Sequence, residues 1–168
     1  MPDYRRPKAT GATIFFTVNL ADREVSLLTD HIAKLRASVA ETRAEHPFAI
    51  DAWVVLPDHM HCVWTLPKRD RAYGQRWGAI KSRFTRKLRK VGALSRHDIR
   101  AAMARSGNAG VWQPRFWEHH IRDANEYRFY REYCWMNPVK HGFVQNPNDW
   151  EYSSVHRDCP QQVRARAG

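Results

Sequence analysis

The stretch that decides the fold is Leu56-Pro-Asp-His-Met-His-Cys-Val-Trp-Thr-Leu66, in which two histidines stand one residue apart within an alternating apolar run. This alternation predicts a β-strand, because side chains two residues apart in a strand point to the same face. His59 and His61 then share one face. The opposite face is apolar and suits a protein core; it consists of Met60, Cys62, Trp64 and Leu66. Two imidazoles on one strand face can reach one metal ion, since neutral imidazole is a common ligand for borderline metals.

A histidine pair is a weak indication of a metal site when it stands alone. Two histidines on a strand are more often half-exposed polar side chains, and a metal centre needs a third ligand and a reacting group. The rest of the chain therefore has to supply both before His59 and His61 count as functional residues.

The composition predicts one domain, residues 1–168, with a polyanionic partner. The chain contains 43% hydrophobic and 12% aromatic residues, which argues against disorder. Its 28 Lys and Arg against 17 Asp and Glu give a formal net charge of +11. This excess favours nucleic acid first and an anionic membrane surface second; a protein that is basic without such a partner is the plain alternative. Residues 1–10 read as a basic arm and 159–168 as an irregular tail.

The cysteines and the hydropathy pattern predict a cytoplasmic protein with no membrane partner. No apolar run approaches the ~18 residues that span a bilayer, and the N-terminus lacks the apolar segment of a secretory signal. Three scattered cysteines without a Cys-x-x-Cys pair indicate a reducing compartment rather than a disulfide framework or a zinc finger.

The expected elements favour an α+β fold with an antiparallel sheet over a doubly wound parallel one. Pro57-Asp58 joins two strands directly, which predicts an antiparallel hairpin. Thr29 is a candidate helix cap, and Asp123 with Glu126 forms an Asp-x-x-Glu capping pattern. In chain order the elements are a strand at 12–20, a helix from about Thr29 to about Glu45, strands at 48–56 and 59–66, a helix at 73–90, a long connection at 91–110, extended structure at 112–122 and a helix from 123 to about Met136.

The helix at 73–90 combines an apolar stripe with a basic face. Residues 81–90 contain six cations and no acid, a pattern typical of contact with a phosphate backbone. We expect DNA to bind Lys81, Arg83, Arg86 and Lys87; a solvated surface is the plain alternative. Tyr4, Tyr73 and Trp112 are aromatic candidates for stacking on unpaired bases, although core packing explains some of them equally well.

The helix that begins near Asp123 offers a reacting group and a further ligand. Tyr133 and Asn137 are four residues apart, one helical turn, so they lie on one side. A tyrosine hydroxyl can act as a nucleophile, and an amide oxygen can complete a divalent-metal site. By spacing alone a packing aromatic and a turn residue are favoured, Pro138 disfavours helical geometry at Asn137, and Tyr130 is an equal candidate for the nucleophile.

Three blocks of sequence resemble the REP-associated tyrosine transposases, which are single-tyrosine HUH endonucleases. They are Leu56-Pro-Asp-His-Met-His-Cys-Val-Trp64, Trp112-Gln-Pro-Arg-Phe-Trp-Glu-His-His-Ile-Arg122 and Tyr133-Cys-Trp-Met-Asn-Pro-Val-Lys-His-Gly142. The resemblance implies a ferredoxin-like, RRM-like antiparallel sheet with packed helices. It also implies that His59 and His61 hold Mg²⁺ or Mn²⁺, that Tyr133 is the nucleophile, and that Asn137 is the third ligand.

The same resemblance implies a substrate and a reaction. The expected substrate is single-stranded DNA from palindromic repeats, recognised as a hairpin with a flanking tetranucleotide. The expected reaction is nicking and joining of this DNA through a 5′-phosphotyrosine. We expect the protein to act at the nucleoid as a monomer or homodimer. We expect Tyr4, Arg5 and Arg6 to contact the tetranucleotide. Two features depart from the family pattern: the long connection at 91–110, and the residues between Tyr133 and Asn137, which are Cys134-Trp135-Met136. Both leave the DNA preference open.

Two other functions fit parts of the sequence. A non-catalytic DNA- or RNA-binding protein on the same fold would also need the basic helix and the aromatic residues. A structural zinc protein would use the histidines for folding, although the absence of a cysteine cluster argues against it.

Overall fold

Four strands form one antiparallel sheet in the order β2-β3-β1-β4. The structure, a computed structural model, describes residues 9–94, 100, 104 and 110–158. The strands are β1 (Thr13–Asn19), β2 (Ala49–Val55), β3 (His59–Thr65) and β4 (Trp117–His120), and the two connecting helices are α2 (Ile32–Glu45) and α3 (Tyr73–Lys90). This β-α-β-β-α-β order is the ferredoxin-like arrangement. The α+β, antiparallel, ferredoxin-like prediction is confirmed.

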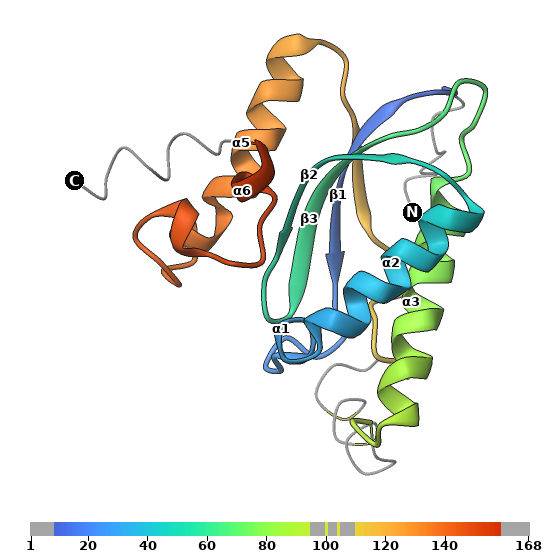
Figure 1. The fold of residues 1–168 in the computed structure, drawn as a ribbon, viewed down its shortest axis with the longest axis vertical. Helices are drawn as coiled ribbons and strands as arrows, with labels where there is room; N and C mark the ends of the chain where they lie inside the picture. Colours follow the sequence, from blue (N-terminus) through green and yellow to red (C-terminus); the bar gives the residue numbers. More distant parts are fainter. Residues whose placement is uncertain (1–8, 95–99, 101–103, 105–109, 159–168) are drawn as a thin grey trace.

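Helices cover both faces of the sheet (Figure 1). α2 and α3 lie together on one face, and α5 (Ala124–Lys140) lies on the other; we call these the α2/α3 face and the α5 face. Three short elements complete the described chain: α1 (Leu27–Asp30), the 3₁₀ helix η1 (Pro147–Asp149) and α6 (Val155–Asp158). No helix in the described residues is long and apolar enough to cross a membrane.

Strand β3 divides its side chains between the two faces as the alternation predicts. Met60, Cys62 and Trp64 are fully buried on the α2/α3 face, where they join the main core with the apolar stripe of α3. That stripe is the predicted set, Trp77, Ile80, Phe84 and Leu88. A smaller cluster lies under α5 and consists of Phe15, Ala52, Val54, Val63 and Cys134. The histidines belong to the α5 face.

The start of the first long helix differs from the prediction. Thr29 lies within α1, and its hydroxyl donates to the backbone carbonyl of Ser26 at 3.1 Å instead of capping a helix. This competition between a local hydroxyl and the backbone is common for threonine. The chain then breaks at His31, and α2 runs to Glu45, the predicted end.

The helix that carries Tyr133 also differs from the prediction, which ended it near Met136. α5 continues to Lys140 with Pro138 inside it. It ends where Gly142 adopts a φ of +74°, with the Phe143 N–H donating to Pro138 O and the Gly142 N–H to Val139 O, both at 2.9 Å. Glycine adopts this left-handed conformation at little cost, and the bond pair is the Schellman ending. Asn137 therefore lies in the same continuous helix as Tyr133.

Candidate active site

The two histidines of β3 lie side by side beneath α5. Their ring centroids are 5.1 Å apart, so the predicted shared face is confirmed. Each residue is only 5% exposed, because α5 packs mainly against β2 and β3. The alternative of two half-exposed polar side chains is wrong.

Both imidazoles are oriented through their Nδ1 atoms. His59 Nδ1 donates to Asp58 Oδ1 at 2.6 Å, and Arg23 pairs with the other oxygen of that carboxylate. Burial raises the pKa of Asp58, but hydrogen bonds with His59 and Arg23 outweigh burial and bring the pKa to about 2. His61 Nδ1 lies 2.8 Å from Thr17 Oγ1. When Nδ1 carries the proton, Nε2 has a free lone pair, the form in which histidine binds metals.

His61 is held neutral. Burial lowers its pKa most, the charges of His59, His141 and Lys140 lower it further, and the result is a pKa of about 3. A neutral imidazole is required of a metal ligand, since a protonated one has no lone pair to donate. The environment of His61 therefore favours ligation over a charged role.

Tyr133 is the tyrosine beside the histidines. Its ring lies 5.3 Å from the His61 ring at 78°, and Lys140 Nζ lies 5.1 Å from the Tyr133 centroid. Tyr130 instead stacks on Phe15 at 4.5 Å and contacts His119 at 5.0 Å. Burial and the charge of Glu126 raise the Tyr130 pKa. The structure thus separates two tyrosines that spacing could not.

Asn137 brings an unpaired buried amide to the same place. The residue is 1% exposed, and neither its Oδ1 nor its Nδ2 has a hydrogen-bond partner among the residues that the structure describes. Its amide raises the pKa of His61, so the two groups face each other, although no hydrogen bond of normal geometry joins them. Such an orphaned amide costs about 1–3 kcal/mol in a buried site.

This donor set fits a divalent cation. It offers two imidazoles and, in the described part of the chain, one amide oxygen without a hydrogen-bond partner, the nitrogen and oxygen donors that Mn²⁺ and Mg²⁺ accept. Across the described ranges, no group of three or more His, Cys, Asp or Glu side chains is arranged to hold a metal. Asn137, whose amide oxygen faces the histidine pair, is the candidate third donor in this group.

Polar contacts fix α5 and so the position of Tyr133. Asp123 caps the helix by accepting from the N–H groups of Asn125 and Glu126 at 2.8 and 2.9 Å, as the capping pattern predicts. The Tyr127 hydroxyl donates to Asp51 at 2.9 Å, at the irregularity in the pairing of β2 with β3. These contacts tie one side of the helix to the sheet edge and leave Tyr133 over the histidines.

The basic residues of α3 lie on the opposite, α2/α3 face. Arg83 pairs with Glu45 at 2.5 Å and Lys87 with Glu41 at 2.7 Å, both acids of α2. The acid-free run in the sequence is therefore not an unpaired surface. Arg86 is exposed and has no ion-pair partner among the described residues. Tyr4, Arg5 and Arg6 lie outside the described residues.

Lys81 is partly enclosed by the segment that follows Gly110. Its Nζ donates to Gln113 O at 2.9 Å and lies within 6 Å of two aromatic rings. Burial lowers its pKa to about 8. With Arg86, Arg89 and Trp112 it lines an open groove of about 380 Å³.

Two of the three aromatic residues proposed for base stacking are buried, and the third, Tyr4, lies outside the described residues. Tyr73 is 2% and Trp112 8% exposed, because both belong to the main core. Among the residues that the structure describes, the large exposed aromatic side chains are Trp117 at 53%, Phe129 at 60% and Phe143 at 47%. The exposure of Trp117 could have been predicted from the alternation in β4, which puts Trp117 and His119 on one face.

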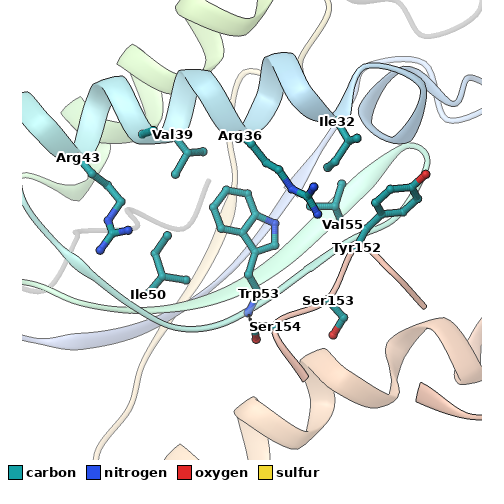
Figure 2. Close-up of a pocket in the computed structure, with 11 residues that line it drawn as sticks. Ile32, Arg36, Val39, Arg43, Ile50, Trp53, Val55, Tyr152, Ser153 and Ser154 are labelled. Carbon is teal, nitrogen blue, oxygen red and sulfur yellow. Dashed lines mark hydrogen bonds between the residues drawn. The ribbon is translucent and has the colours of Figure 1, made fainter. Parts of the chain in front are cut away.

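A separate hollow lies between α2 and the edge strand β2 (Figure 2). It measures about 270 Å³ and is lined by residues from α2, β2 and the segment at 152–154. Trp53 and Arg36 face each other across it. The hollow opens on the α2/α3 side of β2 and contains neither histidine nor Tyr133.

Known proteins with similar sequences show the family. The chain is 44% identical over 158 residues to a REP-associated tyrosine transposase of Escherichia coli (strain K12), covering 94% of this chain and 85% of that protein. This chain belongs to the REP-associated tyrosine transposases. It is 39% identical over 163 residues to a putative REP-associated tyrosine transposase of Haemophilus influenzae (strain ATCC 51907 / DSM 11121 / KW20 / Rd), covering 97% and 90%. The family resemblance of the three sequence blocks is confirmed, and the chain is a transposase.

Solved structures agree with this membership. A REP-associated tyrosine transposase bound to a REP hairpin has a TM-score of 0.79 and 42% identity to this chain, covering 97% of this chain and 88% of the other. A putative transposase from Deinococcus radiodurans has a TM-score of 0.50 at 13% identity, which shows the fold alone. No protein-family model matches this chain.

Proposed function

We propose that this transposase nicks and rejoins single-stranded DNA through a covalent bond to Tyr133. The observation that carries the proposal is the grouping of Tyr133 with the histidine pair: its ring lies 5.3 Å from His61, and Asn137 stands one helical turn further along α5. A nucleophile next to three candidate metal donors is the arrangement that phosphodiester chemistry needs.

The proposed step exchanges one phosphodiester for another. The Tyr133 hydroxyl oxygen attacks the phosphorus, a tyrosine–phosphate bond forms to the 5′ side, and the bond to the 3′ oxygen breaks. The tyrosine loses its proton and the leaving 3′ oxygen gains one, so no net proton is consumed. Because the tyrosine ester keeps the bond energy, the free 3′-hydroxyl can reverse the step and join strands without ATP.

His59, His61 and Asn137 would hold Mg²⁺ or Mn²⁺, which would neutralise phosphate charge and polarise the bond that breaks. The chain supplies the rest. Asp58 and Thr17 orient the two imidazoles, and α5 holds Tyr133 over them. Lys140, beside the Tyr133 ring, offers a cation to the scissile phosphate.

The proposed substrate is a palindromic-repeat hairpin with a single-stranded flank. Support comes from the similar transposase whose solved structure holds a REP hairpin and from the net charge of +11. We place phosphate contacts at Lys81, Arg83, Arg86 and Lys87, and contacts to the flank at Tyr4, Arg5 and Arg6. With this substrate we further propose action in the cytoplasm at the nucleoid, as a monomer or homodimer.

A covalent-adduct assay tests the proposal. The protein is incubated with a labelled repeat hairpin and Mg²⁺ or Mn²⁺, then denatured and separated by size. We expect a labelled protein–DNA adduct that EDTA prevents and that Tyr133→Phe abolishes.

Tyr130→Phe is the matched control, because Tyr130 lies on the same helix but packs against Phe15 and His119, and the substitution keeps its ring. It should leave the adduct intact. The opposite pattern would move the nucleophile to Tyr130, and hairpin binding without any adduct in the unaltered protein would favour the non-catalytic DNA-binding alternative.

A further inference from the structure

Exposed aromatic side chains gather around the candidate active site. In the described part of the chain the exposed large apolar side chains are Val91, Trp117, Phe129, Met136 and Phe143. The three aromatic ones all lie near the site: Trp117 contacts Phe15 under α5, Phe129 is one helical turn before Tyr133, and Phe143 contacts His141. Exposed apolar groups concentrated in one place usually mark a binding surface.

A continuous series of rings leads from the nucleophile to the edge strand. The Phe129 ring lies 6.4 Å from Tyr133 and 5.1 Å from Tyr130, and Tyr130 lies 5.0 Å from His119. His119 in turn stacks on Trp117 at 6.1 Å with an interplanar angle of 10°. We call the four rings Trp117, His119, Phe129 and Tyr130 the aromatic shelf.

The sheet register ties the shelf to the histidines. Trp117 of β4 is the partner of Thr17 of β1, and Thr17 is the partner of His61 of β3. The three side chains thus form one row across neighbouring strands, with Trp117 about 10 Å from His61 at the usual strand spacing. Because α5 packs mainly on β2 and β3, the β1–β4 end of this row stays open, as the exposure of Trp117 shows.

We propose that the aromatic shelf binds unpaired bases of the single strand that carries the scissile phosphate. The inference rests on the proposed function and names where the flank of the hairpin runs: from Tyr133 across Phe129 toward Trp117. Aromatic faces stack on bases of any sequence, so the shelf holds the strand, while the choice of sequence is made elsewhere.

Charge around the shelf suits a nucleic-acid strand better than an apolar partner. Exposed cations flank it at Arg115, Arg122 and Arg128. The acid at its border, Glu126, is paired with Arg122 and bonded to His119. An open shelf with cations at its rim offers stacking to bases and charge to phosphates.

The test measures binding without chemistry. In a Tyr133→Phe background with EDTA, affinities are measured for a repeat hairpin with a single-stranded flank and for the same hairpin cut blunt. Trp117→Ala and Phe129→Ala should each weaken binding of the flanked hairpin about tenfold or more and leave the blunt hairpin unchanged. Trp117→Phe should restore most of the loss, because a phenyl ring still stacks.

Val91→Ala, exposed at the far end of α3, and Phe143→Ala, on the His141 side, are matched controls. Both should bind like the parent. Three results would contradict binding of the flank by the aromatic shelf. They are unchanged binding of the flanked hairpin by Trp117→Ala, an equal loss of affinity for the blunt hairpin, and an equal loss of affinity in Phe143→Ala.

Failure of the proposed function has a different signature. The unaltered protein would form no covalent adduct, whatever the shelf variants bind. A 2-aminopurine base in the flank gives an independent signal, since its fluorescence should change on binding to the parent and not to Trp117→Ala.

Discussion

The α2/α3 face and the α5 face cover the same sheet in different ways. Two long helices bury the α2/α3 face with large apolar side chains, and the carboxylates of α2 pair with cations of α3. One helix covers the α5 face, where the buried apolar cluster is small and where buried histidines and, within the described residues, an unpaired amide also lie. The first face therefore holds the fold together. The second retains polar groups and exposed rings at a cost in stability, which is usual for functional sites.

The largest effect that should separate the faces is the loss of a core aromatic residue. Trp64 is fully buried on the α2/α3 face and stacks on Trp77 at 4.2 Å. Trp64→Ala should lower the free energy of unfolding by about 3–5 kcal/mol, measured by urea denaturation. Trp117→Ala on the α5 face should lower it by less than about 1 kcal/mol, because its ring is half exposed. Equal losses would mean that the α5 face also carries the fold.

A smaller effect should come from metal bound at the α5 face. Mn²⁺ at one hundred times its dissociation constant should stabilise the folded protein by about 2.7 kcal/mol, seen as a rise in melting temperature that EDTA reverses. His61→Ala should abolish this rise. His141→Ala should keep it, although the His141 ring lies 5.1 Å from His59. Loss of the rise in His141→Ala but not in Asn137→Ala would make His141 the third ligand.

The smallest effect concerns the basic residues of the α2/α3 face. Burial lowers the pKa of Lys81 to about 8, so Lys81 of the free protein loses its charge as pH rises through 8. If Lys81 contacts a phosphate, the slope of log affinity against log salt should decrease by about 0.7–0.9 between pH 7 and pH 9. Lys81→Gln should have the smaller slope at both pH values, and a persisting pH effect in Lys81→Gln would exclude this contact.

The same pKa shift affects stability. The pKa of Lys81 in the folded protein lies below its usual value of 10.5, so the unfolded chain binds more protons between pH 8 and 10.5. The contribution of Lys81 to the free energy of unfolding should therefore rise with pH across this window. Urea denaturation of the parent and of Lys81→Gln at the two ends of the window would measure the difference.

Local patterns predicted much of the fold. The alternation of β3 identified both the core side chains Met60, Cys62 and Trp64 and the shared face of the histidines, because strand geometry has a strict period of two. The apolar stripe of α3 was equally predictable, since it depends on a few neighbouring residues. The length of α5 could not be predicted in the same way. Pro138 disfavours helical geometry at the residue before it, and only the hydrogen bonds that continue to the end of the helix overcome that preference.

Long-range relations escaped prediction. The pairing of Lys87 with Glu41 joins residues 46 positions apart, so the basic run of α3 looked free of acids. Trp112 was a candidate for base stacking, with core packing as the alternative, and it is buried against Phe84. Trp117 and Phe129, which were not named as candidates, are exposed. Burial depends on what packs against a side chain, and a local pattern does not show this.

The sequence by itself determined most of the elements and the family, and it named the candidate donors His59, His61 and Asn137, because strand and helix periodicity and short motifs are local properties. The tertiary structure decided that Tyr133, and not Tyr130, lies beside His61. It also decided that the basic helix lies on the face away from the histidines and that an aromatic shelf lies next to them. The physical reason is that the packing of α5 across β2 and β3 sets these distances between residues far apart in the chain.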